Sequence, residues 1–95
     1  MDLTRLFYPR SVAVVGASPN MGGGKIPFFQ IIKAAGYTGG LYPVNPAHRE
    51  IGGIKVVPSI AELPDEVDLA ILSVPARVAL DTLKEAVKKK IPFAL

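Results

Sequence analysis

The sequence contains no cysteine, which excludes a disulfide framework and a thiolate metal site. It has no apolar run long enough to cross a bilayer, and its first residues, MDLTRLFYPR, lack the apolar core of a signal peptide. The sequence also lacks a large excess of one charge. Its net charge of +3 suits a small anionic ligand and is too weak to argue for nucleic acid. We therefore expect a cytoplasmic protein with neither a nucleic-acid nor a membrane partner.

What is present indicates one small globular unit. The 95 residues are 49% hydrophobic and 20% charged, a composition typical of a folded domain. We expect residues 1–95 to form a single domain. The chain stops inside an apolar stretch, IPFAL, and because domains rarely end halfway along such a strand, we expect a truncated part of a longer protein.

Strands alternate with helices along the chain. Ser11–Val15 is a continuous apolar run, typical of a strand buried on both faces of a parallel sheet. Apolar residues at helical spacing predict helices over 26–35 and 76–89, the second with a buried stripe of Ala79, Leu83, Ala86 and Val87. Further strands are predicted over 40–44, 54–57, 68–74 and 92–95, and single helical turns over 3–8 and after Ser59. This order indicates an α/β fold with a doubly wound parallel sheet, cut short in its fifth strand.

A glycine-rich loop joins the first strand to the first helix, in the segment SVAVVGASPNMGGGK, residues 11–25. Ligands of doubly wound sheets bind at the carboxyl ends of the strands, where this loop lies. Glycine lets the backbone approach a phosphate, and the following helix offers free N–H groups. Ser18 adds a hydroxyl and Lys25 adds a positive charge. The loop therefore has the chemistry of an anion site.

Two common phosphate motifs do not fit this loop. The P-loop pattern fails because Pro19 replaces its first glycine and Ile26 replaces its magnesium-binding hydroxyl residue, so ATP or GTP binding of that type is excluded. The dinucleotide pattern G-x-G-x-x-G fails because Ser18 and Met21 stand at its second and third glycines. The second strand ends in YPVNP without an acidic residue, which disfavours NAD but leaves a ligand with a phosphorylated ribose open.

Several stretches together resemble one family. They are LFYPRSVAVVGAS, GGLYPVNP and GxxxVxPSIxELPxxVDLAILSVPA with the helix that follows. They resemble the CoA-binding domain of nucleoside-diphosphate-forming acyl-CoA synthetases, with the α subunit of succinyl-CoA synthetase as a more distant relative. The resemblance runs in register over residues 3–95. It implies a Rossmann-like domain that binds coenzyme A or acyl-CoA within an ADP-forming acid–thiol ligase, and that is not catalytic by itself.

The resemblance also implies which residues contact the ligand. The family's phosphate loop matches Gly16, Ala17 and Ser18, and the start of its covering helix matches Gly24 and Lys25. The turn on the adenosine side matches Val44, Asn45 and Pro46. The loop beside the pantetheine arm matches Val74, Pro75 and Ala76. Some relatives carry a lysine after the YPVNP stretch, where this sequence has Ala47, His48 and Arg49.

No catalytic residue or metal ligand is predicted. In the family, the phosphorylated histidine belongs to a following domain, and His48, the only histidine here, is expected to be a solvated loop residue. The carboxylates Asp65, Glu66 and Asp68 precede the strand predicted over 68–74, at the edge opposite the ligand, and are expected to be solvated too.

Two alternatives to CoA binding stay open. One is an NADP-type dinucleotide-binding domain, with a pyrophosphate on the same loop and Arg49 on the ribose phosphate. The other is a structural or regulatory domain that keeps the fold without a ligand. As protein partners, the resemblance implies further domains or a second subunit of a synthetase, and a homo-oligomer that covers exposed apolar surface stays open.

Overall fold

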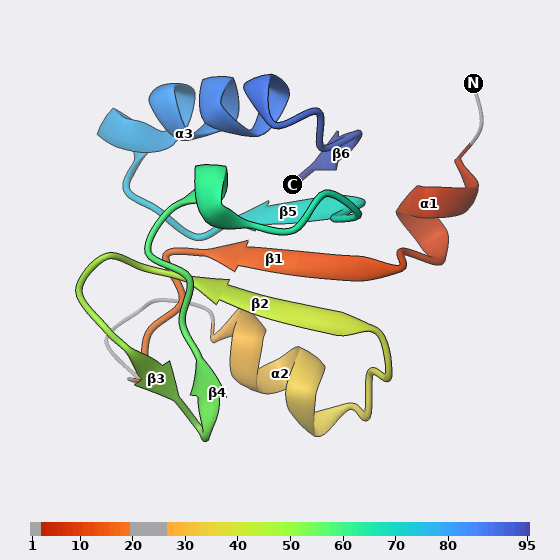
Figure 1. The fold of residues 1–95 in the computed structure, drawn as a ribbon, viewed down its shortest axis with the longest axis vertical. Helices are drawn as coiled ribbons and strands as arrows, with labels where there is room; N and C mark the ends of the chain where they lie inside the picture. The colour runs from red at the N-terminus through yellow and green to blue at the C-terminus, as the bar shows by residue number, and fades with distance from the viewer. Residues whose placement is uncertain (1–2, 20–26) are drawn as a thin grey trace.

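The computed structural model describes residues 3–19 and 27–95. Its main sheet has four parallel strands in the order β2–β1–β5–β6, namely β2 (Gly40–Val44), β1 (Ser11–Val15), β5 (Leu69–Leu72) and β6 (Phe93–Ala94). Helix α2 (Phe28–Ala34) precedes β2, and helix α3 (Ala76–Lys88) lies between β5 and β6 in the chain (Figure 1). A short helix, α1 (Thr4–Phe7), leads into β1. The expected α/β, Rossmann-like sheet is confirmed.

The central strand β1 is buried on both faces, as its apolar run predicts. All five of its residues are buried. Val14 packs in one hydrophobic cluster with Phe29 of α2, and Val15 packs in a second cluster with Ile60. Because successive side chains of a strand point to opposite faces, the two clusters lie on opposite sides of the sheet. Ile60 begins the 3₁₀ helix η1 (Ile60–Glu62), which lies beside α3 (Figure 1).

The strand predicted over 54–57 is only partly correct. β4 (Ile54–Lys55) pairs antiparallel with β3 (Glu50–Ile51) in a separate two-stranded sheet, which the sequence analysis did not predict. Val57 then returns to the main sheet through one parallel bridge to Val44. Two-residue strands are too short to carry a periodic pattern, so only the glycine turn between them was visible in the sequence.

The buried face of α3 also differs from the predicted stripe. Thr82 and Ala86 are buried, whereas Leu83 and Val87 are 40% and 67% exposed. The hydroxyl of Thr82 donates a hydrogen bond of 2.9 Å to the carbonyl of Val78, so a polar side chain can be buried there without an unsatisfied group. The predicted stripe is therefore correct at Ala86 and wrong at Leu83 and Val87, because hydrophobicity alone does not reveal that Thr82 is buried.

Asp68 is not solvated, and that prediction is wrong. Its side chain is 2% exposed and accepts hydrogen bonds from the Arg10 backbone N–H (2.8 Å), from Nε (2.9 Å) and from Nη2 (2.7 Å). These hydrogen bonds hold the pKa of Asp68 below its ordinary value, although burial acts in the opposite direction. Asp65 and Glu66 are exposed, as expected. The Arg10–Asp68 pair joins the amino ends of β1 and β5.

The strand register places three loops side by side at the carboxyl edge of the sheet, opposite the Arg10–Asp68 pair. Val15, the last residue of β1, is in register with Val44 at the end of β2 and with Leu72 at the end of β5. The segments that follow these residues therefore leave the sheet side by side, at the carboxyl edge where ligands of this architecture bind.

Candidate functional site

A crevice of about 460 Å³ opens at the carboxyl edge of the sheet, between the ends of β1, β2 and β5. Six of the residues predicted to contact a ligand line it: Gly16, Val44, Asn45, Pro46, Val74 and Pro75. The three predicted segments, which are far apart in the sequence, therefore meet at one site.

The other predicted residues lie in or beside these segments. Ala17 and Ser18 continue the loop after β1, where Ala17 is buried and Ser18 is half-buried, and Ala76 begins α3. Gly24 and Lys25 lie outside the described residues. The structure thus groups nine of the eleven predicted residues around one edge, and ligand contact by each of them stays a prediction.

Gly16 is fixed by its neighbours in a conformation that suits glycine. Its φ is +87°, in the left-handed region. Its N–H donates a 2.7 Å hydrogen bond to the carbonyl of Val44, which joins the ends of β1 and β2. A Cβ at this position would lie 2.9 Å from the carbonyl carbon of Ser73, closer still to the carbonyl oxygen, and 3.0 Å from a methyl group of Val74. The glycine is therefore required for the close approach of the loops after β1 and β5.

Asn45 joins the loops after β1 and β2. Its Nδ2 donates to the carbonyl of Ala17 at 2.8 Å, and its Oδ1 accepts the N–H of Ala47 at 2.8 Å. Its own N–H donates to the carbonyl of Val57 at 3.0 Å. Through these hydrogen bonds Asn45 stabilises the loops that form the crevice wall, a role that the matched motif alone did not indicate.

The sequence analysis missed the wall opposite these loops. Pro58, Ser59 and Ile60, around the start of η1, line the crevice together with Thr82 and Glu85 of α3. The spacing of Ser59 and Glu62 predicted only a helical turn, and the two α3 residues look like ordinary helix positions. No local pattern could have assigned them, because the fold alone places η1 beside α3.

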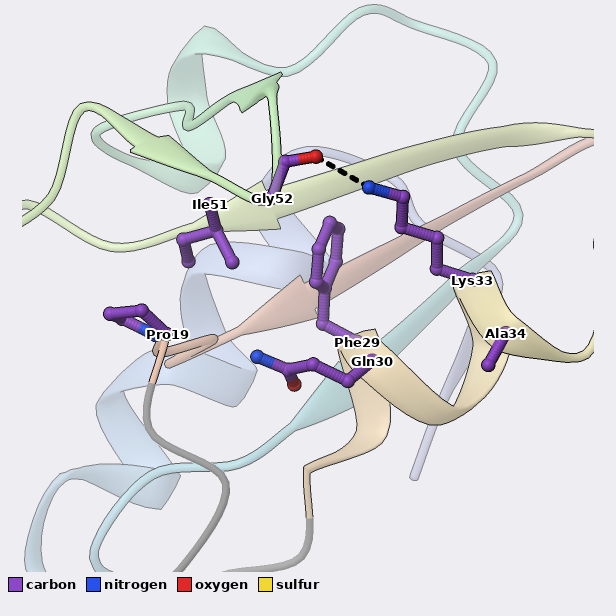
Figure 2. A pocket seen from close by; sticks show the side chains of 7 residues that line it. All are labelled: Pro19, Phe29, Gln30, Lys33, Ala34, Ile51 and Gly52. Carbon is purple, nitrogen blue, oxygen red and sulfur yellow. Dashed lines mark hydrogen bonds between the residues drawn. The ribbon is translucent and has the colours of Figure 1, made fainter.

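A second cleft, of about 490 Å³, lies between α2 and the β3–β4 hairpin. Figure 2 shows Phe29 and Ile51 facing this space, with the ammonium group of Lys33 donating to the carbonyl of Gly52 across its rim. Gln30 also lines the cleft and donates to the carbonyl of Ser18 at 2.6 Å, which ties α2 to the loop after β1. None of the nine predicted ligand residues that the structure describes lines this cleft, and it shares no described lining residue with the carboxyl-edge crevice.

Within 3–19 and 27–95, no group of three or more histidine, aspartate or glutamate side chains could hold a metal ion. No helix in that part of the chain is long and apolar enough to span a bilayer.

Comparison with known proteins identifies the family. Residues 10–95 match the family model described as the CoA binding domain. The chain is 45% identical, over 99% of its length, to the ADP-forming acetate–CoA ligase II of Archaeoglobus fulgidus, of which it covers 14%. It is 41% identical, over 96% of its length, to the α subunit of ADP-forming acetate–CoA ligase I of Pyrococcus furiosus, of which it covers 21%.

A solved structure gives the same relationship. The dinucleotide-forming acetyl-coenzyme A synthetase 1 of Ca. Korarchaeum cryptofilum, solved with phosphate and ADP, superposes with a TM-score of 0.86 at 38% identity. The match covers 98% of this chain and 20% of that one. The chain therefore belongs to the family of CoA-binding domains found in ADP-forming acyl-CoA synthetases.

Proposed function

We propose that the carboxyl-edge crevice binds coenzyme A. The observation that carries the proposal is the convergence of Gly16, Asn45 and Val74, from three separate loops, on one crevice in a chain that belongs to the CoA-binding family. The phosphates would lie near the loop after β1, and the pantetheine arm would pass the loop after β5.

Free backbone donors at this edge support an anionic ligand. The N–H of Ala17 has no hydrogen-bond partner in the described part of the chain. Within residues 3–19 and 27–95, no side chain caps the first turn of α3, and the N–H groups of Ala76 and Arg77 at its positive end have no hydrogen-bond partner. Because the N–H of Gly16 is taken by Val44, that glycine would serve the site through its conformation rather than as a donor.

The chain would be the CoA-binding module of an ADP-forming acyl-CoA synthetase. It matches a small share of the length of the ligases that it resembles, so further domains or a second subunit would supply the phosphoryl-transfer chemistry. Coenzyme A would then be a substrate that this module presents to those parts. Residues 1–95 would form one domain of that assembly.

Thermal unfolding with and without CoA tests the proposal. A ligand that binds only the native state at about 100 times its Kd raises the free energy of unfolding by about 2.7 kcal/mol, so CoA is expected to raise the melting temperature by several degrees. NADPH is the control, because an NADP-type domain would respond to it instead. A response to NADPH but not to CoA, or to neither nucleotide in a folded sample, would contradict CoA binding.

A further inference from the structure

The carboxyl-edge crevice extends away from the sheet edge along α3. Thr82 and Glu85 line it and lie six and nine residues after Ala76, the first residue of the helix. At the α-helical rise this places them about 9 and 14 Å along the helix axis. Ser59, which precedes η1, lines the same crevice.

The polar groups on this wall are hydrogen-bond acceptors. Thr82 already donates its hydroxyl proton to the carbonyl of Val78, at 2.9 Å, so its oxygen can only accept a further hydrogen bond. The hydroxyl of Ser59 is directed to a carboxylate oxygen of Glu62, at 3.4 Å. An ionised Glu85 carboxylate has no proton to donate.

Glu85 is left without a cation. Lys89, four residues later at the C-cap of the helix, would be the ordinary ion-pair partner of Glu85. Its ammonium group instead lies 3.6 Å from a carboxylate oxygen of Asp65 and 3.3 Å from the carbonyl of Ala61. No ion pair or hydrogen bond of the Glu85 side chain is found among residues 3–19 and 27–95. Its negative charge therefore stays available to a ligand.

Apolar side chains form much of the rest of the crevice lining. They come from the ends of β2 and β5, from around the start of η1 and from α3, namely Val44, Pro46, Val74, Pro58, Ile60 and Val78. Apolar walls with acceptors at one end fit a flat heteroaromatic ring that carries an amino group. The same wall repels phosphate, because Glu85 is negatively charged.

We propose that the adenine base of CoA lies against this wall, with its exocyclic amine donating to Glu85, and that Glu85 selects adenine over hypoxanthine. This inference rests on the proposed binding of CoA. It also sets the direction of the ligand, since the phosphates must lie at the other end of the crevice, near Ala17 and the start of α3. Glu85 would act as a specificity residue and take no part in acyl transfer.

The test compares the affinity for CoA with that for its inosine analogue, in which a carbonyl replaces the amine. The inosine analogue keeps an N–H at ring position N1, but at position 6 the Glu85 carboxylate of the unaltered protein meets a repelling carbonyl in place of an N–H donor, so CoA is expected to bind about tenfold more tightly. Glu85→Gln presents both an acceptor and a donor, and the ratio of the two affinities is expected to fall to about one. Asp81→Asn, on the same helix but outside the crevice lining, is the matched control and should keep the original ratio.

The outcomes distinguish the placement of adenine at Glu85 from the proposed binding of CoA. Equal affinities in the unaltered protein, or an unchanged ratio in Glu85→Gln, would overturn the adenine placement while CoA binding stands. Failure of the unaltered protein to bind CoA would overturn both. Melting curves of the two variants without ligand should match that of the unaltered protein, which shows that any change in the ratio does not come from unfolding.

Discussion

Gly16 and Gly53 have almost the same backbone conformation but different surroundings. Their φ angles are +87° and +82°. A Cβ at Gly16 would collide with the carbonyl group of Ser73, whereas one at Gly53 would meet no atom of the described residues within 4 Å. The two positions therefore separate the cost of a left-handed backbone from the cost of pushing two loops of the crevice apart.

Alanine at the two positions should have unequal effects. Gly53→Ala is expected to cost about 1–2 kcal/mol of stability, the usual penalty of a side chain in the left-handed region, without changing CoA affinity. Gly16→Ala should cost more and also weaken CoA binding, because the loop after β5 must move. Urea unfolding and CoA titration of both variants check this. Equal losses of stability, with equal affinities, would show that the contact with Ser73 does not shape the site.

At the scale of elements, the Arg10–Asp68 pair aligns the two central strands at their amino ends. Arg10 precedes β1 and Asp68 precedes β5, and the carboxylate accepts three hydrogen bonds from that one arginine. Burial of Tyr37 raises the pKa of its hydroxyl, which donates to the carbonyl of Pro9 at 2.8 Å beside the same pair. This cluster orients the strands whose opposite ends form the crevice.

The pair predicts a pH dependence of stability. Because the folded state lowers the pKa of Asp68 from 3.8, its stabilisation is fully present above that value and is lost as the pH falls through the folded-state pKa. Asp68→Asn should be less stable than the unaltered protein at pH 7, and the difference should shrink below about pH 4. Urea unfolding at several pH values measures it.

Asp65→Asn provides the control for this experiment. The Asp65 side chain is 98% exposed, and its carboxylate lies 3.6 Å from the Lys89 ammonium, so its removal should change stability little at any pH. A difference between the unaltered protein and Asp68→Asn that stays constant from pH 7 to pH 3 would contradict the account of the pair.

The elements differ in how far the sequence predicted them. β1, α2 and α3 were predicted because long apolar patterns mark them, and the φ of +82° at Gly36 just past α2 agrees with the expected helix end. The burial of Asp68 was missed because Arg10 is 58 residues away in the sequence. The crevice wall that carries Ser59, Thr82 and Glu85 was missed for the same reason, since only the packing of α3 against η1 makes it part of the crevice.

At the scale of the whole molecule, three concave surfaces formed by residues within 3–19 and 27–95 compete as ligand sites. One is the carboxyl-edge crevice, and another is the cleft between α2 and the β3–β4 hairpin. The third lies at the amino edge, where Arg10 and Glu66 line a pocket of about 460 Å³. Size does not separate them, so the choice of the crevice depends on the predicted residues that meet there and on the free N–H groups beside it.

Mapping the CoA-induced changes in backbone amide NMR signals tests this choice most directly. The account predicts that the largest changes fall on Ala17, Ser18, Asn45, Val74 and Ala76, with smaller changes at Thr82 and Glu85. Changes confined to Gln30, Lys33 and Gly52, or to the residues around Arg10 and Glu66, would place the ligand elsewhere and contradict the central claim.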